Sequence, residues 1–224
     1  PMMATFGGAS VRGFGHGISV GGGAPGWITG YRSVSSSAND RYTYMSVDSS
    51  DDIVCVGYQI GGDGKIHKFD DDGSIVWQKK IPDVEFFGVT TDSSDNIYAV
   101  GRTDNSSYGT PFTAIIFKLN LSGVIQWQRW LSSGSSDKFE NVKVDSSGNV
   151  YCVGECRPST HGNTLADFLL AKYNSSGTLQ WYRMLGGSSN DNGTDLVIDS
   201  SNNIYATGHT GSDGAGSFDQ YIVK

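Results

Sequence analysis

A twelve-residue motif occurs four times in this chain and constrains its fold more than any other feature. The copies read SVDSSDDIVCVG at 46–57, TTDSSDNIYAVG at 90–101, KVDSSGNVYCVG at 143–154 and VIDSSNNIYATG at 197–208. Their aspartates are 44, 53 and 54 residues apart, and each precedes a glycine by nine residues; they are Asp48, Asp92, Asp145 and Asp199. A chain with this period consists of supersecondary units that stack on one another.

A second block follows the first three copies of the motif. It has a lysine, a glycine five residues later and a tryptophan four residues after the glycine, as in Lys68, Gly73 and Trp77. The same spacing recurs with Trp127 and Trp181. The fourth copy reaches YIVK, which ends at Lys224.

Each unit has the pattern of four short strands. An alternating stretch leads into a DSSxN turn, β-branched and aromatic residues follow, and a variable loop precedes two strands joined by a glycine turn. The chain has 31 glycines and only nine leucines, which argues against a helical bundle. Because a single meander cannot bury both faces, the sequence predicts an all-β fold with four meanders stacked around an axis, a β-propeller.

The two ends of the chain carry unpaired parts of the repeat. The segment GWITGYRSV at 26–34 resembles a fourth strand, with Trp27 at the tryptophan position, while the last unit has only three strands. We expect residues 26–32 to pair with residues 219–224 and close a four-bladed ring, which removes exposed sheet edges. The rival is an open arc that another chain completes. The expected domains are an arm at 1–25 and a propeller at 26–224.

One stretch resembles a known repeat family. Residues 166–210 resemble the SBBP-type β-propeller repeat, and the glycine-to-tryptophan spacing also looks like the blades of quinoprotein-like propellers. The matching positions are Asp167, Phe168, Ala171, Lys172, Gly177, Leu185, Gly186, Gly187, Asp199, Ser200, Asn203, Tyr205 and Gly208. The resemblance implies a propeller over residues 27–224, but it implies no function, because one fold serves many functions.

The first 26 residues have a different composition, with nine glycines. This segment resembles the Gly-rich leading segments of bacteriophage tail and virion proteins. A free arm of this composition is disordered. We therefore expect it to pack on its own propeller or to dock on a neighbouring subunit, through the candidate assembly residues Phe6, Arg12, Phe14 and His16.

Charge and cysteine content restrict the partners and the compartment. The net charge of −7 and the lack of clustered cations argue against nucleic acid as a partner. No apolar run is long enough to insert into a membrane, and the N-terminus does not read as a signal peptide. We expect reduced thiols and assembly in a host cytoplasm. Cys55 and Cys152 stand where other copies have alanine, which predicts small buried side chains.

No catalytic or metal-binding motif stands out. The four histidines lack metal-ligand spacing, and Asp70, Asp71 and Asp72 precede a glycine in the pattern of a turn, not of a calcium loop. Nucleophile elbows, phosphate loops and paired-carboxylate motifs are not recognisable. We therefore expect no enzyme activity, no cofactor and no metal.

The predicted topology separates two ends of the propeller. One end collects the aspartate-rich turns, and the opposite end collects loops that vary between copies. Because rigid scaffolds carry recognition on loops, the candidate recognition residues are at the second end. They are Tyr42, Arg102, Tyr108, Arg157, His161 and His209. The repeated aspartates and tryptophans are expected to be structural.

Three functions remain open at this stage. The first is a non-enzymatic bacteriophage virion component, tail-associated or decorating, that binds a host surface, other virion proteins or its own copies. The second is a bacterial cell-surface propeller that binds a glycan or a protein. The third is a quinoprotein-like or hydrolytic enzyme whose residues come together only across blades.

Overall fold

The computed structural model describes residues 3–6, 9–14, 31–35, 40–60, 62–103, 112–158 and 165–224. These residues form antiparallel β-sheets in which each strand pairs with its neighbours in chain order. The N-terminal sheet consists of β1 (Met3–Phe6), β2 (Ala9–Phe14) and β3 (Tyr31–Ser35).

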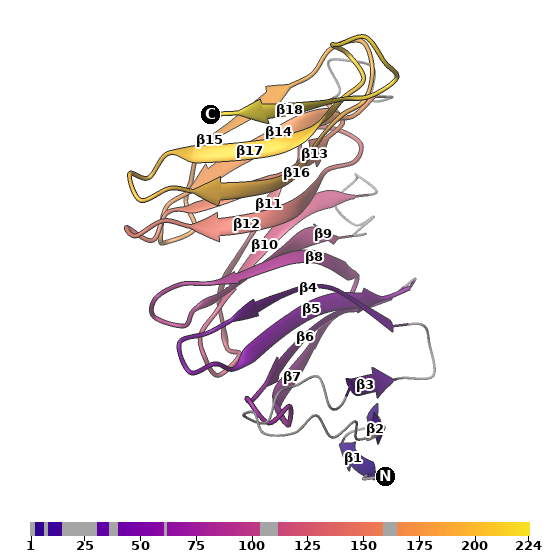
Figure 1. Cartoon of the computed structure of the whole chain (residues 1–224), viewed down its shortest axis with the longest axis vertical. Helices are drawn as coiled ribbons and strands as arrows, with labels where there is room; N and C mark the ends of the chain where they lie inside the picture. The colour runs from indigo at the N-terminus through magenta and orange to yellow at the C-terminus, as the bar shows by residue number, and fades with distance from the viewer. Residues whose placement is uncertain are drawn as a thin grey trace, which may run out of the picture.

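Three four-stranded sheets follow and a three-stranded sheet ends the chain (Figure 1). The first has β4 (Asp40–Val47), β5 (Ile53–Gln59), β6 (Gly64–Phe69) and β7 (Ile75–Ile81). The second has β8 (Val84–Thr91), β9 (Ile97–Thr103), β10 (Thr113–Leu119) and β11 (Ile125–Leu131). The third has β12 (Lys138–Val144), β13 (Val150–Cys156), β14 (Asp167–Tyr173) and β15 (Leu179–Leu185). The last has β16 (Asp191–Ile198), β17 (Ile204–Thr210) and β18 (Asp219–Val223).

This arrangement confirms the all-β class and the predicted order of three complete meanders followed by a three-stranded one. Closure of the ring is not confirmed. Among the described strands β18 pairs only with β17, and β3 pairs with β2. The N-terminal and C-terminal sheets lie at opposite ends of the stack (Figure 1). Residues 26–30, which were expected to close the ring, lie outside the described residues.

A bulge at one place in the first strand of each of the last four sheets explains the repeated glycine. The register shifts between Tyr42 and Tyr44 in β4, and at the matching place in β8, β12 and β16. In each sheet the glycine of the second strand faces this bulge, so that a Cβ would fall on a backbone carbonyl oxygen of the first strand. Only glycine fits there. These glycines are Gly57, Gly101, Gly154 and Gly208.

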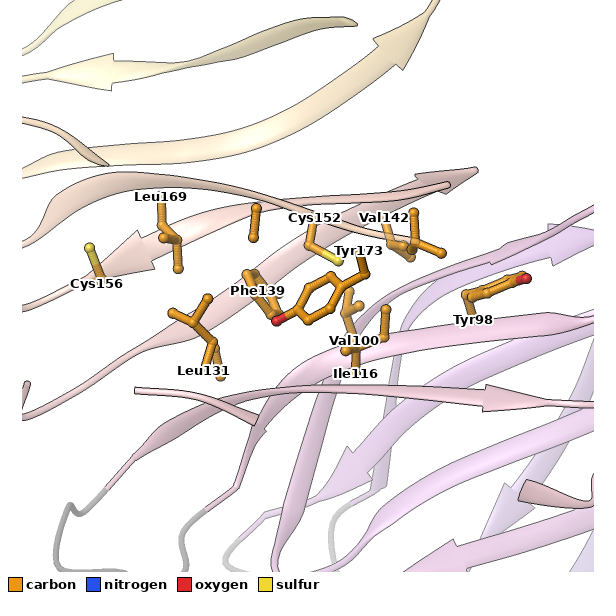
Figure 2. Close-up of a cluster of buried hydrophobic side chains, with 13 residues drawn as sticks. Tyr98, Val100, Ile116, Leu131, Phe139, Val142, Cys152, Cys156, Leu169 and Tyr173 are labelled. Atoms are coloured by element: carbon orange, nitrogen blue, oxygen red, sulfur yellow. The ribbon is translucent and has the colours of Figure 1, made fainter. Parts of the chain in front are cut away.

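The hydrophobic core lies between successive sheets. Figure 2 shows the layer between the second and third four-stranded sheets, where Tyr98 and Ile116 meet Phe139, Cys152 and Tyr173. All five are at most 1% exposed. Two further layers join the first sheet to the second and the third to the last. A fully buried large apolar side chain contributes about 1.5–3 kcal/mol, so these layers hold the sheets together.

Candidate functional site

The four repeated aspartates cap the turn between the first two strands of each sheet. Asp92 Oδ1 accepts hydrogen bonds from the backbone nitrogens of Ser94 and Asn96, at 2.9 and 3.0 Å. The same two contacts recur at Asp48, Asp145 and Asp199. Burial alone would raise the pKa of Asp92, but hydrogen bonds from Asn96, Ser94 and Tyr98 hold this pKa below its ordinary value. These carboxylates therefore serve turn structure.

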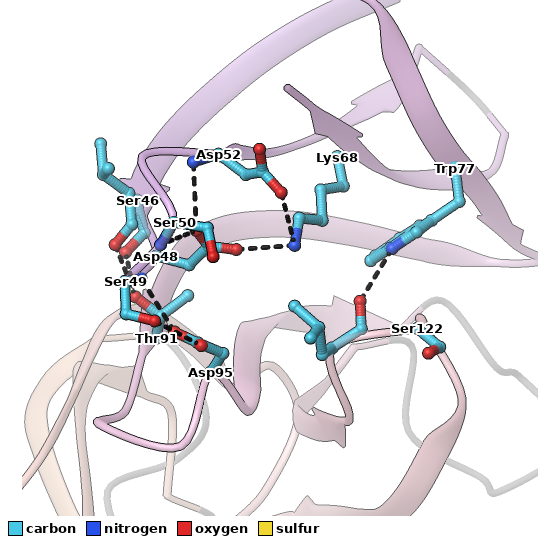
Figure 3. Close-up of polar contacts among 12 residues, drawn as sticks. Ser46, Asp48, Ser49, Ser50, Asp52, Lys68, Trp77, Thr91, Asp95 and Ser122 are labelled. Atoms are coloured by element: carbon cyan, nitrogen blue, oxygen red, sulfur yellow. Dashed lines mark hydrogen bonds and ion pairs between the residues drawn. The ribbon is translucent and has the colours of Figure 1, made fainter. Parts of the chain in front are cut away.

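A repeated lysine stabilises the same end of the sheets. In three sheets its ammonium lies 5.1 to 5.3 Å from a tyrosine ring of the adjacent strand, in the pairs Lys118 and Tyr98, Lys172 and Tyr151, and Lys224 and Tyr205. The first four-stranded sheet has Val54 at the tyrosine position. There Lys68 Nζ instead lies 2.6 Å from Asp48 Oδ2 and 3.0 Å from Asp52 Oδ2 (Figure 3).

The repeated tryptophans connect each sheet to the next. Trp77 Nε1 donates to the carbonyl of Leu121 at 3.0 Å (Figure 3), and Trp127 Nε1 donates to the carbonyl of Ser175 at 3.3 Å. Both carbonyls belong to the last turn of the following sheet. These tryptophans are structural, as are the aspartates. Trp27 lies outside the described residues.

The end of the sheets opposite the aspartate turns carries a row of cross-strand pairs, at one equivalent position in each of the last four sheets. In each pair, the residue after the repeated glycine lies opposite a residue of the first strand. The first-strand residue comes just before the bulge. The four pairs are Arg41 with Tyr58, Glu85 with Arg102, Lys138 with Glu155, and Asn192 with His209. We call these eight residues the pair row. It is the candidate recognition site, because its chemistry differs in every sheet while the surrounding positions repeat.

The type of contact within each pair depends on which two side chains form it. The Arg41 guanidinium lies 5.1 Å from the centre of the Tyr58 ring. The Arg102 guanidinium binds the Glu85 carboxylate through Nε at 2.8 Å and Nη2 at 2.7 Å. The other two pairs are held by an ion pair of 3.5 Å between Lys138 and Glu155 and a hydrogen bond of 2.9 Å between Asn192 and His209.

Aromatic side chains link the pairs across the sheets. Phe87, the bulge residue of β8, has its ring 5.8 Å from the Tyr58 ring, 5.7 Å from the Arg102 guanidinium and 5.8 Å from Lys138 Nζ. Phe218 packs edge-on against His209 with ring centres 5.1 Å apart. The side chains of the row are therefore held on strands around aromatic rings, which fixes their positions before any ligand arrives.

A hollow of about 580 Å³ adjoins the last pair of the row. Its lining includes His209, Thr194, Thr207, Gln220 and Ile222. It offers hydroxyl, imidazole and amide groups beside an exposed isoleucine, so it can accommodate a ligand that is partly polar and partly apolar.

The sequence-predicted recognition residues are distributed unevenly. Arg102 and His209 belong to the pair row. Tyr42 lies on β4 with its hydroxyl 2.8 Å from Nδ1 of His67, on a face of the sheet and not in a loop. Arg157 follows β13, and its backbone nitrogen donates to Asp137 Oδ1 at 3.2 Å. Tyr108 and His161 lie outside the described residues.

The candidate assembly residues belong to the N-terminal segment. Phe6 ends β1, and Arg12 and Phe14 lie on β2, which pairs with β1 and β3. His16 lies outside the described residues.

Sequence reasoning missed six residues of the pair row, namely Arg41, Tyr58, Glu85, Lys138, Glu155 and Asn192. One signal was available: the residue after the repeated glycine is different in all four copies, namely Tyr58, Arg102, Glu155 and His209. Its cross-strand partner could be found only with the bulge and the register in hand.

The inner strands also meet across the axis of the stack. Asn141 Nδ2 of β12 donates to the Tyr44 hydroxyl of β4 at 3.1 Å and to Asp195 Oδ1 of β16 at 2.6 Å. Asn141 is only 2% exposed. Three sheets therefore converge on one amide, which gives the stack the fan shape of propeller blades.

Cysteine and metal chemistry receive no support in the described part of the chain. Burial raises the pKa of the Cys55 thiol to about 11. Burial is also the main reason that the pKa of the Cys156 thiol rises to about 12. Within the ranges described, no three His, Cys, Asp or Glu side chains form a group that could hold a metal ion. Those ranges also contain no helix that is long and apolar enough to cross a membrane.

Comparison with known proteins supports the repeat and the fold. Residues 180–214 match the SBBP family model, which is described as a beta-propeller repeat. No curated protein matches the chain. A crystal structure of a protein of unknown function from Bacteroides caccae aligns with a TM-score of 0.54 at 11% identity, over 87% of this chain and 63% of that one. This likeness concerns the fold alone and says nothing of activity.

Two further structures align more weakly. A gluconolactonase from Xanthomonas campestris has a TM-score of 0.42 at 13% identity, over 73% of this chain and 52% of that chain. A neuraminidase-like protein from A/bat/Guatemala/164/2009 has a TM-score of 0.48 at 13% identity, over 84% of this chain and 55% of that chain. The present chain thus spans less than two thirds of the length of these proteins.

Proposed function

We propose that this protein is a non-enzymatic recognition and assembly component in which propeller-type sheets present the pair row to a host surface or to neighbouring subunits. The observation that carries the proposal is the contrast between fixed and varied positions. Turn aspartates, bulge glycines and tryptophans repeat from sheet to sheet, while the residue after each glycine is Tyr58, Arg102, Glu155 or His209.

The electrostatics of the row support binding to a partner with mixed charge and hydrogen-bonding groups. In the Arg102 and Glu85 pair the side chains are 28% and 23% exposed, and Lys138 is 24% exposed. Such groups remain within reach of a ligand, yet their partners and Phe87 restrict their rotamers. Binding to a preorganised row loses less conformational entropy than binding to free loops.

The proposed setting is a bacteriophage particle assembled in the host cytoplasm, with the N-terminal segment as the assembly element. The Gly-rich composition of residues 1–26 supports this setting. Among the described strands the last sheet has three, and in this proposal a fourth comes from the same chain or from another chain. The ring predicted from the sequence is the first of these two arrangements.

Binding to the host surface can be tested with labelled full-length protein and intact host cells. The variant that combines Arg102→Ala, Lys138→Ala and His209→Ala should bind at least about tenfold more weakly, because it removes directional contacts at three pairs. The control variant combines Lys79→Ala and Lys80→Ala, two cations on the outer strand β7 that belong to no pair of the row. Equal binding by the two variants would contradict a recognition role for the pair row.

The virion setting needs a separate measurement. Immunolabelling of purified particles should place the protein on the particle surface. Particles that lack the protein would leave the cell-surface propeller as the better candidate.

A further inference from the structure

A cavity of about 460 Å³ lies between the third four-stranded sheet and the last sheet. Its lining includes Leu170, Trp181, Arg183, Ile204 and Val223. Trp181 occupies the repeated tryptophan position, so the equivalent places in the two preceding sheets show what fills such a space.

In the second four-stranded sheet, which contains Trp127, the equivalent space is occupied by a turn of the third four-stranded sheet. Trp127 Nε1 donates to the carbonyl of Ser175 at 3.3 Å, and the Arg129 guanidinium donates to the carbonyls of Gly177 at 2.7 Å and Ser176 at 3.2 Å. Gly177 lies so close to the indole that a Cβ there would come within 2.8 Å of it. Trp77 makes the same kind of contact with the turn that contains Leu121 and Gly123.

No turn in the described part of the chain covers Trp181 and Arg183 in this way. Among the described residues Trp181 Nε1 makes no hydrogen bond, and Arg183 donates only to the neighbouring carbonyl of Tyr182, at 2.9 Å. Leu185 is 45% exposed, whereas Leu131 at the equivalent position of β11 is 6% exposed. The side chains that would hold a turn are present on β15, but the part of the chain that the structure describes does not cover them.

The adjacent edge of β18 is also open. The third strands β6, β10 and β14 each pair on both sides, whereas β18 pairs only with β17 among the described strands. Ile222 on β18 is 69% exposed, while the equivalent Ile66 and Ile116 are completely buried. The cavity and the edge therefore lack one and the same element, a glycine turn followed by a strand.

The sequence contains one more segment with the required spacing. Gly23 precedes Trp27 by four residues, as Gly123 precedes Trp127 and Gly177 precedes Trp181. In the register of the complete sheets, Lys172 pairs with Trp181 and Leu170 with Arg183. The same register would place Gly23 on the Trp181 indole, Trp27 opposite Lys224 and Thr29 opposite Ile222.

We propose that residues 20–30 of a second copy of this chain occupy the Trp181 cavity and add a fourth strand to β18. This inference rests on the proposed assembly function and names the partner. The donor is a second copy because β3, which begins at Tyr31, belongs to the N-terminal sheet at the far end of the stack from β18 (Figure 1). Strand addition supplies main-chain hydrogen bonds, and the glycine turn supplies acceptors for the free indole and guanidinium donors.

Disulfide trapping between two single variants tests the proposal directly. Full-length Thr29→Cys and Ile222→Cys proteins are mixed under mild oxidation and separated on a non-reducing gel. A mixed dimer should form at least about tenfold faster than in a control mixture of Thr29→Cys with Val76→Cys, whose site on β7 is exposed but not at the β18 edge. The three native cysteines are buried, which keeps the background low.

The double variant Thr29→Cys with Ile222→Cys distinguishes the two arrangements. Disulfide-linked oligomers support donation between copies. A disulfide-linked monomer shows closure within one chain and overturns the proposal, as does a mixture that forms no dimer although both single variants keep the wild-type circular dichroism spectrum.

A second readout does not depend on cysteine chemistry. In light scattering over a range of concentrations, Trp27→Ser should remain monomeric where the wild-type protein associates, and Trp130→Ser, which alters an exposed tryptophan on β11, should associate normally. Association of Trp27→Ser at the wild-type level contradicts the proposal. Neither measurement uses the pair row, so failure here leaves the cell-binding test of the proposed function intact.

Discussion

Lys68 Nζ lies 2.6 Å from Asp48 Oδ2, and the two side chains are only 3% and 2% exposed. The ion pair exists because Val54 replaces the tyrosine that lies under the equivalent lysine in the other sheets. Burial alone would lower the pKa of Lys68, but Asp48 and Asp52 more than offset this and raise it. The lysine is therefore charged and neutralised inside the first sheet.

Replacing this lysine by a neutral side chain should strongly destabilise the protein. Lys68→Met leaves the buried Asp48 carboxylate without its counter-charge, which costs about 3–5 kcal/mol in the free energy of unfolding. Lys80→Met is the matched control, because Lys80 pairs with Asp63 but is 63% exposed, and it should cost less than about 1 kcal/mol. Urea denaturation of both variants measures the difference, and similar losses would contradict the structural role of the buried pair.

The bulge glycines should not tolerate even one methyl group. In Gly101→Ala the new Cβ falls on the carbonyl of Glu85, so the strand pair must separate or the bulge must move. We expect a loss of about 3 kcal/mol or more in the free energy of unfolding. Gly216→Ala is the control, because its Cβ would meet nothing closer than 3.8 Å. Thermal melts of the two variants should differ clearly, and equal melting temperatures would argue against the bulge explanation.

Stability should fall with mild acid because of His67. Burial, reinforced by Lys65, lowers the pKa of His67 to about 4 in the folded protein. In the unfolded chain the pKa of this histidine has the ordinary value of about 6.5, so the unfolded chain takes up the proton first as the pH falls. Protonation therefore stabilises the unfolded chain relative to the folded protein. The resulting loss in the free energy of unfolding begins as the pH falls below about 6.5 and should reach about 2 kcal/mol by pH 5. In His67→Gln the loss over this window should disappear, and an unchanged pH profile in that variant would refute the assignment.

Much of the fold was accessible from the sequence because the repeats mark equivalent positions. The spacing of Asp48, Asp92, Asp145 and Asp199 was enough to place the turns and the strand order. The reason for Gly101 was not accessible, because the bulge in β8 appears only when two strands are in register. Tyr42 was expected in a loop for the same reason: its place opposite Gly57 on β4 depends on that register.

The candidate site was accessible only in part. Arg102 and His209 were found because they were counted in the loops that vary between copies, although both lie on strands, in β9 and β17. Glu85 and Lys138 are far from these residues in the sequence, and no local pattern distinguishes them from other charges on strands. The path of the N-terminal segment depends on which sheet edge it reaches, and composition does not specify an edge.

The pair row should tolerate substitution far better than the repeated positions. Arg102→Leu removes a partly exposed ion pair with Glu85 but keeps apolar contact with Phe112, whose ring lies 4.2 Å from the guanidinium. We expect a loss of about 1 kcal/mol at most in the free energy of unfolding. Differential scanning calorimetry at low and high salt checks this value. A loss as large as that of Lys68→Met would assign the row to structure and remove the main support for a recognition role.

The two equivalent tryptophans should differ in their contribution to stability, and the difference should depend on protein concentration. Trp127 packs against Gly177 and donates to the carbonyl of Ser175, so Trp127→Ala should cost about 3 kcal/mol. Trp181 lies in an open cavity, so Trp181→Ala should cost only about 1 kcal/mol in dilute protein, because fewer contacts are lost. If a second copy covers Trp181, the cost of Trp181→Ala should rise with concentration, since bound partner stabilises the folded state by mass action. Denaturation of both variants at dilute and concentrated protein measures this, and a cost for Trp181→Ala that equals that of Trp127→Ala at every concentration would show that the cavity is already filled within one chain.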